Sequence, residues 1–278
     1  HHVRVSVVSR GYGALDNGLN DEALELELKL PDVPHIQNVD RVAAAVLAQD
    51  ELDAQIVVMD DGFQHRRLHR DLNIVLIDAT EPFGYGHMLP RGLLREPVAS
   101  LRRADLVIAT RSDQVEQQQL ANIRTRIQRY APSCGWAEAV HAPMRLKNCQ
   151  GVAASLELIA QSRCIVFCGI GNAQAFKNTV LSLGGAIDQF LEFPDHHAYA
   201  LDDIRKLEST VQEVKRLHPN APLLLLCTGK DLPKVNLAAI EDIPLYAVDI
   251  EMQIRYGLEV FQEHLDQVVS AAKQIKPE

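Results

Sequence analysis

The sequence lacks the features that mark membrane-spanning and nucleic-acid-binding proteins. No apolar stretch in its 278 residues approaches the roughly 20 residues that a membrane-spanning helix requires. The formal net charge is −9, with 28 Lys and Arg against 37 Asp and Glu. No global positive field would therefore gather the phosphates of a nucleic acid, and we expect no nucleic-acid partner.

The sequence also has few cysteines, and their spacing is not that of zinc ligands. They are Cys134, Cys149, Cys164, Cys168 and Cys227. Cys164 and Cys168 lie within an apolar run, where packing is the expected role. The odd number and the absence of a paired framework fit a reducing compartment.

Two glycine-rich nucleotide-binding patterns are missing as well. The phosphate-binding pattern Gly-x-x-x-x-Gly-Lys-Ser/Thr, whose amides and lysine cradle phosphates, occurs nowhere in the sequence. Gly169-Ile170-Gly171 lies between a predicted strand and a predicted helix, but the third glycine of a dinucleotide-binding fingerprint does not follow. A glycine turn is therefore expected there rather than an NAD site.

Short β-branched runs alternate with helical stretches along the whole chain. With 47% hydrophobic and 23% charged residues, this alternation predicts an α/β protein. The expected strands are Val3–Ser9, Gln55–Met59, Leu72–Asp78, Asp105–Thr110, Cys164–Cys168, Leu223–Cys227 and Leu245–Ile250. The expected helices are Asp40–Leu47, Gln114–Tyr130, Ala173–Leu183, Leu201–Leu217 and Leu258–Ile275.

The pattern weakens from about Cys134 to Gln161, which predicts a connection between two domains. We expect a core domain at 1–148, a second α/β lobe at 149–256, and a C-terminal helix at 257–278 that packs back on the core.

The strongest local signal is Met59-Asp60-Asp61-Gly62, where an apolar strand ends in two carboxylates. The carboxyl edge of a parallel sheet is where α/β proteins bind ligands. Carboxylate oxygens there suit Mg²⁺ bound to nucleotide phosphates. The alternative is that both aspartates cap the following turn.

Several further motifs, in order along the chain, make this sequence similar to one enzyme family. They are Ser9–Gly13 (SRGYG), Asp21-Glu22, Asp60–Leu72 (DDGFQHRRLHRDL), Asn73–Asp78 (NIVLID), Phe83–Gly86 (FGYG), Leu89–Pro97 (LPRGLLREP), Phe167–Asn172 (FCGIGN), Phe193–Tyr199 (FPDHHAY) and Thr228–Asp231 (TGKD). Together they closely resemble the tetraacyldisaccharide 4'-kinases, P-loop kinases of lipid A synthesis.

The resemblance implies a P-loop-kinase-like parallel-sheet domain, here without its first strand and P-loop, and a second, smaller α/β domain. It implies phosphorylation of the 4'-hydroxyl of tetraacyldisaccharide 1-phosphate, with ATP and Mg²⁺ as cofactors. It also implies a peripheral enzyme on the cytoplasmic face of the bacterial inner membrane, with the membrane surface and the lipid A precursor as partners.

For the nucleotide side, the resemblance implies that Asp60 helps to hold Mg²⁺ and that Asp61 supports the metal or the loop geometry. Gln64 and His65 would contact phosphate or substrate, or else cap the turn. Arg95 would pair with phosphate or with charge that develops in the transition state, since its planar fork suits phosphate oxygens.

For the acceptor side, the resemblance implies that Asp21 works with His196 to take the proton of the sugar hydroxyl. Without the resemblance, Asp21 would be interpreted as a helix N-cap. His197 is expected to be structural. Lys230 would approach the nucleotide or lie in a surface turn. The basic cluster of residues 66–70 is either a solvated face or a contact for an anionic lipid head group.

The missing phosphate loop should lie upstream of His1, so we expect the chain as given to bind ATP poorly and to have little kinase activity. Either the sequence is a piece of a longer polypeptide or it is a degenerate relative. Two other functions remain open: a non-catalytic nucleotide- or lipid-binding relative, and a metal phosphoesterase built around Asp195-His196-His197. The latter class needs more upstream Asp and His ligands than the sequence supplies.

Overall fold

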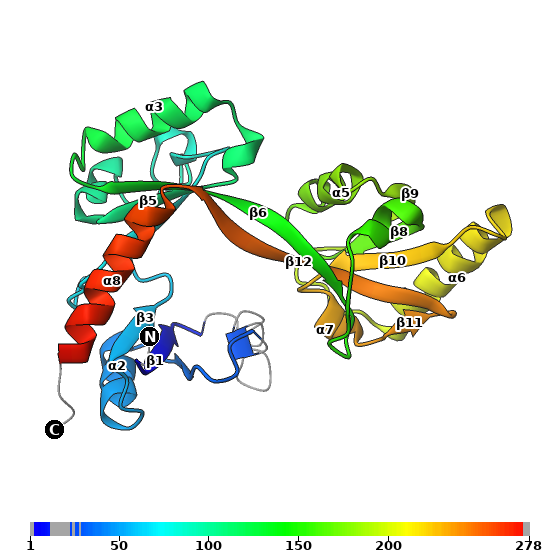
Figure 1. The fold of residues 1–278 in the computed structure, drawn as a ribbon, viewed down its shortest axis with the longest axis horizontal. Helices are drawn as coiled ribbons and strands as arrows, with labels where there is room; N and C mark the ends of the chain where they lie inside the picture. Colours follow the sequence, from blue (N-terminus) through cyan, green and yellow to red (C-terminus); the bar gives the residue numbers. More distant parts are fainter. Residues whose placement is uncertain (1–2, 12–22, 24–25, 28, 275–278) are drawn as a thin grey trace. The chain divides into compact units, whose positions relative to one another are not determined.

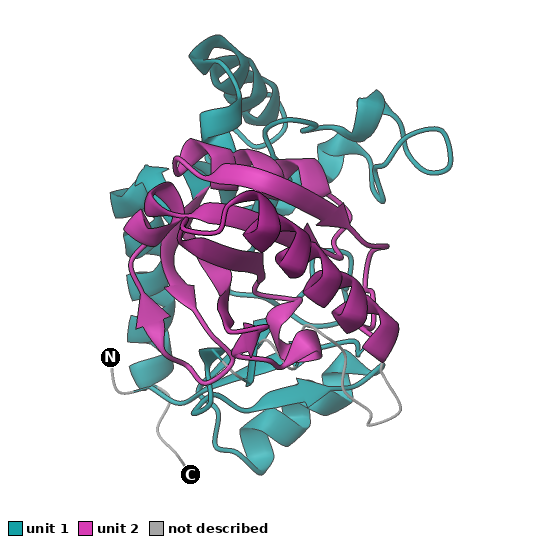
Figure 2. Cartoon of the chain, turned by 90° about the vertical axis from the view of Figure 1, so that its right-hand side faces the viewer, with its two compact units in different colours: residues 1–140, 253–278 teal, residues 141–252 magenta. Residues whose placement is uncertain are grey.

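A computed structural model describes residues 3–11, 23, 26–27 and 29–274. The chain forms two compact units, coloured separately in Figure 2: residues 1–140 with 253–278, and residues 141–252. None of the helices within the described ranges combines the length and the apolar character needed to cross a bilayer. Each unit has its own parallel strands and its own core.

The first unit begins with a three-stranded parallel sheet in the order β2-β1-β3. Its strands are β1 (Val5–Ser9), β2 (His35–Gln37) and β3 (Ile56–Met59). Helix α2 (Arg41–Asp50) connects β2 to β3, and the Asp40 carboxylate caps it by accepting from the backbone N–H groups of Val42 and Ala43. The predicted strands and helix of this region, labelled β1, β3 and α2 in Figure 1, are confirmed to within three residues at each end.

The rest of the first unit is built on parallel strands in the order β4-β5-β6. Its elements are β4 (Ile74–Asp78), β5 (Leu106–Thr110), β6 (Gly135–Lys147), α3 (Gln117–Gln128), α8 (Leu258–Gln274) and the 3₁₀ helices η1 (Gly84–Gly86), η2 (Val98–Arg103) and η3 (Ser112–Gln114). One face of β5 packs on α3 through Leu120 and Ile123. Val260 and Phe261 of α8 pack with Leu106, on the other face.

Two strands of the first unit end their sheets. In the described part of the chain, β3 has a hydrogen-bonded neighbour on one side, β1, and β4 likewise has β5. Both strands expose apolar side chains, including Val58 of β3 and Leu76 of β4. Each is therefore an edge strand.

The second unit holds parallel strands in the order β12-β10-β8-β9. Its elements are β7 (Ala153–Ala154), α4 (Glu157–Gln161), β8 (Arg163–Cys168), α5 (Ala173–Ser182), β9 (Ala186–Glu192), α6 (Leu201–Leu217), β10 (Leu223–Thr228), α7 (Leu232–Val235), β11 (Ala239–Ile240) and β12 (Ile243–Tyr256).

The continuous apolar sequence of β10 follows from helices on both faces of this sheet. Leu225 packs on one face with Leu207 of α6, while Leu224 and Leu226 pack on the other with Phe176 of α5. Successive residues of a strand point to opposite faces, so a strand buried on both sides has no polar alternation.

The division between the units differs from the predicted boundaries at 148/149 and 256/257. The structure divides at 140/141 and 252/253, because β6 and β12 are long strands that run from one unit into the other. The connection predicted from about Cys134 to Gln161 contains the 140/141 division, and about half of it is a 13-residue strand, β6. Small side chains and Pro143 hide its alternation.

Candidate active site

The turn after β3 places two neighbouring carboxylates in different surroundings. The Asp60 N–H donates to the Val8 carbonyl at 2.9 Å, which fixes the end of β3 beside β1, and the Asp60 side chain is exposed. Asp61 has a φ of 47°, in the left-handed region. A Cβ on the buried Gly62 would lie 2.7 Å from Met59 Cγ, so the turn closes tightly against its own strand.

Asp61 forms a two-pronged ion pair with Arg95. Arg95 Nη1 donates to Asp61 Oδ2 at 2.8 Å and Nη2 donates to Oδ1 at 2.6 Å. The hydrogen bonds from Arg95 hold the pKa of the Asp61 carboxyl below its ordinary value and raise that of the guanidinium. Both side chains remain half-exposed, so the guanidinium is oriented by Asp61 without being sealed from solvent.

Two further arginines hold the same turn from inside. Arg70 Nη1 donates to the carbonyls of Gly62 at 2.6 Å and His65 at 2.5 Å. Arg103 Nη2 donates to Glu96 Oε2 at 2.6 Å, and its guanidinium carbon lies 4.4 Å from the centre of the Phe63 ring. The turn 61–65 and the segment 95–96 are thereby joined into one assembly.

A cavity of about 280 Å³ adjoins this assembly. Its polar lining includes Gln64, Arg95 and Glu96, while Phe83 and Leu94 contribute apolar walls. A cavity with charged groups of both signs beside an apolar wall suits a ligand that is partly polar and partly apolar.

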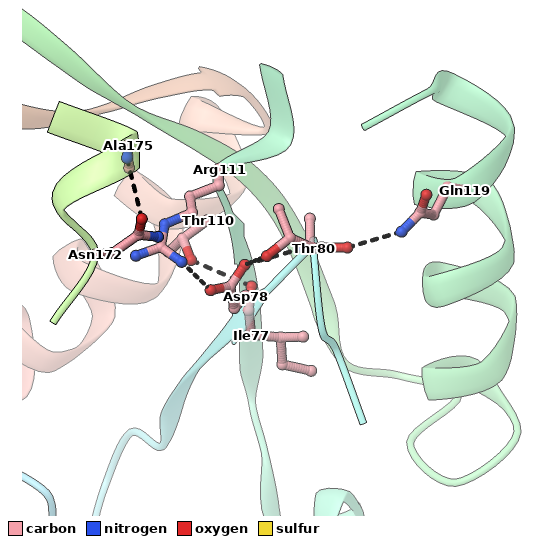
Figure 3. Close-up of polar contacts among 9 residues, drawn as sticks. Ile77, Asp78, Thr80, Thr110, Arg111, Gln119, Asn172 and Ala175 are labelled. Carbon is pink, nitrogen blue, oxygen red and sulfur yellow. Dashed lines mark hydrogen bonds and ion pairs between the residues drawn. The ribbon is translucent and has the colours of Figure 1, made fainter. Parts of the chain in front are cut away.

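The carboxylate that ends β4, Asp78, has hydrogen-bond and ion-pair partners within the first unit. Asp78 pairs with Arg111 and accepts from the backbone N–H of Thr80 at 3.0 Å and from its hydroxyl at 2.6 Å (Figure 3). Gln119 of α3 donates to the Ala79 carbonyl at 3.0 Å. Asp78 thus joins the end of β4 to Arg111, which follows β5, while the neighbouring Ala79 carbonyl makes the bond to α3.

In the second unit, Asp231 gathers three loops at the carboxyl edge of the sheet. Its carboxylate is fully buried and accepts from the Gly169 N–H at 3.1 Å, the Tyr199 hydroxyl at 3.0 Å and the Thr228 hydroxyl at 2.5 Å. Gly169 follows β8, Tyr199 follows β9, and Thr228 is the last residue of β10. Burial, together with the Asp231 charge, raises the pKa of the Tyr199 hydroxyl.

The two adjacent histidines of this edge differ in their contacts. The backbone N–H of His196 donates to the Gly169 carbonyl at 3.2 Å, and the φ of His196 is 59°. Its exposed ring has Nε2 3.9 Å from Asp195 Oδ2. The His197 ring stacks on Phe193 at 4.8 Å, and its Nε2 lies 2.9 Å from an oxygen of Asp203. His197 is therefore held in the fold, while the ring of His196 faces solvent.

The predicted site residues are divided between the two units, and one of them, Asp21, lies outside the described part of the chain. The first unit carries Asp60, Asp61, Gln64, His65 and Arg95. The second unit carries His196 and Lys230, on neighbouring loops that Asp231 joins.

Sequence reasoning missed the residues that support these groups. Asp231 stood within a recognised motif without an assigned role. Arg70 was expected in a basic cluster that forms a solvated face or a contact for a lipid head group, but it turns inward onto the backbone of the turn. For Asp231, its position directly after the apolar strand β10 was a usable signal, because carboxylates at strand ends gather at one sheet edge. For Arg70, no spacing rule predicts that a side chain turns back to carbonyls of residues 62 and 65.

The carboxylate arrangement fits a magnesium ion held mainly by nucleotide phosphates. Of the described residues, none pairs with the Asp60 carboxylate, whereas Asp61 is occupied by Arg95. The described ranges contain no cluster of three or more His, Cys, Asp and Glu arranged as metal ligands. Mg²⁺ usually binds through one or two carboxylates, with water and phosphate completing its shell.

Comparisons with known proteins agree on one family. The family model described as tetraacyldisaccharide-1-P 4'-kinase (LpxK) matches residues 1–270. The tetraacyldisaccharide 4'-kinase of Syntrophus aciditrophicus is 34% identical, over 94% of this chain and 70% of the relative. That of Anaeromyxobacter sp. strain Fw109-5 is 35% identical, over 97% and 74%.

A solved structure supports the fold. It is LpxK from Aquifex aeolicus, in a complex with ATP, which superposes with a TM-score of 0.68 over 96% of this chain and 79% of that one. The sequence identity is 24%. The comparison therefore shows a shared fold.

Proposed function

Because this chain belongs to the tetraacyldisaccharide-1-P 4'-kinase family, we propose that the protein transfers the γ-phosphoryl group of ATP to the 4'-hydroxyl of a tetraacylated glucosamine disaccharide 1-phosphate. This is a step of lipid A biosynthesis. The observation that carries the proposal is the family match over residues 1–270.

On the nucleotide side, Asp60 is the residue that would hold Mg²⁺, which would neutralise phosphate charge when bound. Asp61 orients Arg95 through their two hydrogen bonds. The half-exposed Arg95 would then pair with phosphate oxygens, and Gln64 and His65 lie on the same turn. Oriented charges of this kind stabilise a transition state because they need no rearrangement during the reaction.

On the acceptor side, His196 would accept the proton of the sugar hydroxyl, in partnership with Asp21. The backbone of His196 is held by the hydrogen bond from its N–H to the Gly169 carbonyl, and its ring is exposed. Lys230 lies one residue before Asp231 and would approach the nucleotide. A base that is held within hydrogen-bonding distance of the hydroxyl accelerates the reaction, because binding has already fixed the orientation of the reacting groups.

The location of the protein follows from its acylated substrate. We place it on the cytoplasmic face of the bacterial inner membrane as a peripheral protein, with the membrane surface as a partner. The net charge of −9 supports the expectation that nucleic acid is not a partner.

The test uses the full-length gene product, ATP labelled at the γ-phosphate, Mg²⁺ and the tetraacyldisaccharide 1-phosphate. We expect the label to appear on the 4'-position of the lipid. ATP binding without transfer would favour the non-catalytic relative. Hydrolysis of a phosphoester with Mn²⁺ and without ATP would favour the metal phosphoesterase.

A further inference from the structure

Residues 84–94, here called the apolar loop, display a cluster of large apolar side chains on the surface of the first unit. Tyr85 is 68% exposed, Met88 47%, Leu89 59% and Leu93 59%. Every residue from 85 to 91 is exposed. Such a concentration in one short segment marks an interaction surface, whereas single exposed apolar residues are ordinary.

The apolar loop is a folded structure whose backbone groups bond to one another. The Leu89 N–H donates to the Leu94 carbonyl at 3.0 Å, and the Leu94 N–H donates to the His87 carbonyl at 3.2 Å. The Gly92 N–H donates to Met88 at 3.0 Å and the Leu93 N–H to Gly84 at 3.1 Å. A loop that satisfies its own polar groups can enter an apolar phase at a lower cost than an open one.

Glycine makes this compact backbone possible. Gly84 has a φ of 51°, and a Cβ there would lie 2.9 Å from the Leu94 nitrogen. A side chain would therefore push the two ends of the loop apart. The apolar side chains are displayed outward because the interior of the loop is filled by its own backbone.

The charge of this segment is opposite to that of the chain. The apolar loop, residues 84–94, contains Arg91 and no Asp or Glu, although Glu81 and Glu96 lie on either side of it and the whole chain carries −9. Arg91 is exposed at the tip, next to Leu89 and Pro90. Exposed apolar and basic groups side by side match the interface of an anionic bilayer, with its buried acyl chains and negative head groups.

We propose that the apolar loop is an interfacial anchor, which inserts Tyr85, Met88 and Leu89 into an anionic lipid surface while Arg91 pairs with head groups. The proposal rests on the proposed function, since that substrate is itself a lipid. Gly84 and Leu93 of the loop also line the 280 Å³ cavity beside Arg95. The anchor therefore brings the mouth of this cavity to the surface where an acylated substrate lies.

Vesicle sedimentation tests the anchor without ATP or substrate. Full-length protein is mixed with vesicles of phosphatidylethanolamine and phosphatidylglycerol, and the bound fraction is measured. We expect Leu89→Glu to lower the partition coefficient by about tenfold or more, since it removes an apolar side chain from the bilayer and adds a charge that anionic lipid repels. The matched control is Leu217→Glu, because Leu217, at the end of α6, is 60% exposed, much like Leu89. This variant should leave vesicle binding unchanged.

The electrostatic part has its own pair of variants. Arg91→Glu should weaken binding to anionic vesicles several-fold more than Arg129→Glu, another exposed arginine of the first unit. The difference should shrink as salt is raised, because salt screens exposed charges. Circular dichroism of every variant checks that the fold is kept.

Fluorescence locates the loop in the bilayer. The chain has one tryptophan, and Trp136 is buried, so a Tyr85→Trp variant adds a reporter at the loop. Brominated lipids should quench it more strongly than a Tyr130→Trp control after α3. The proposal is overturned if the reporter is not quenched or if Leu89→Glu binds vesicles like the parent protein. It is also overturned if size-exclusion chromatography shows that the parent protein is a dimer which Leu89→Glu dissociates, because the loop would then bind a second copy of the chain. Vesicle binding without phosphoryl transfer would leave the anchor standing and remove the proposed function.

Discussion

Asp231 shows how one buried carboxylate can organise a reactive edge. It accepts hydrogen bonds from three segments of the second unit, and one of them, through Gly169, also holds the backbone of His196. An asparagine at this position would place its NH₂ group, which cannot accept a hydrogen bond, opposite one of the three donors. The charge and the number of acceptor sites therefore both matter here.

We expect Asp231→Asn to lower the free energy of unfolding by about 1–3 kcal/mol, since it removes hydrogen bonds to a charged, buried group. Urea titration followed by circular dichroism measures the change. The control is Asp202→Asn, whose side chain is 90% exposed and pairs with Arg205 on α6, and which should be close to neutral. Equal stability of both variants would show that the three loops do not depend on Asp231.

The Asp61–Arg95 pair should depend on pH in a definite direction. Because Arg95 lowers the pKa of Asp61 in the folded state, the pair contributes stability above the ordinary carboxyl value of 3.8. That contribution is lost as the pH falls through the lowered pKa. Since both groups are half-exposed, we expect a coupling energy of only about 0.2–1 kcal/mol at pH 7.

A double-mutant cycle of Asp61→Asn and Arg95→Gln measures this coupling. The coupling should be present at pH 7 and decrease steadily as the carboxylate is protonated. A coupling that grows on acidification would contradict the ion pair.

At the scale of elements, strong periodicity and apolar runs predicted most of the fold. Helix α6 has the predicted bounds, Leu201–Leu217, because its apolar residues recur at helical spacing between polar ones. The strands β2, β6 and β9 were missed, as were the two-residue strands β7 and β11. In β9 the burial is intermediate at most positions, so no clean alternation exists. In β6 small residues replace the usual β-branched ones.

The candidate site was predictable where a motif ends a strand, as at Asp60 and Asp61. Its supports were not, because they act across long sequence separations. Arg95 reaches Asp61 over 34 residues, and Asp231 reaches Gly169 over 62. Contacts of this kind depend on sheet order, and a single sequence does not specify which strand lies beside which.

The core side of α6 gives a prediction at this scale. Leu207 is fully buried against β10, whereas Leu201, on the same helix, is 77% exposed. We expect Leu207→Ala to cost about 2–5 kcal/mol of unfolding free energy, from lost burial and the cavity left behind. Leu201→Ala should cost far less. Both are measured by urea denaturation, and similar costs would mean that α6 does not pack as described.

At the scale of the whole molecule, the predicted reacting groups are divided between the two units. Asp60 and Arg95 belong to the first unit and His196 to the second. We expect His196→Ala in the full-length gene product to lower kcat by about 100-fold or more, as for loss of a general base. The affinity for ATP should change little. Rapid-mixing turnover and equilibrium ATP binding separate these effects, and unchanged kcat would remove His196 from the mechanism.

The edge strands β3 and β4 have a consequence for handling the protein. Among the described residues, each ends its sheet with exposed apolar side chains and with backbone groups that can pair with a further strand. Two molecules can pair through these edge strands by backbone hydrogen bonds. The resulting aggregates would scatter more light as the protein concentration rises. Lysine in place of Val58 or Leu76 would discourage that pairing, since a charge at a rim repels its copy. Preparations of the 278-residue chain should therefore keep best when dilute.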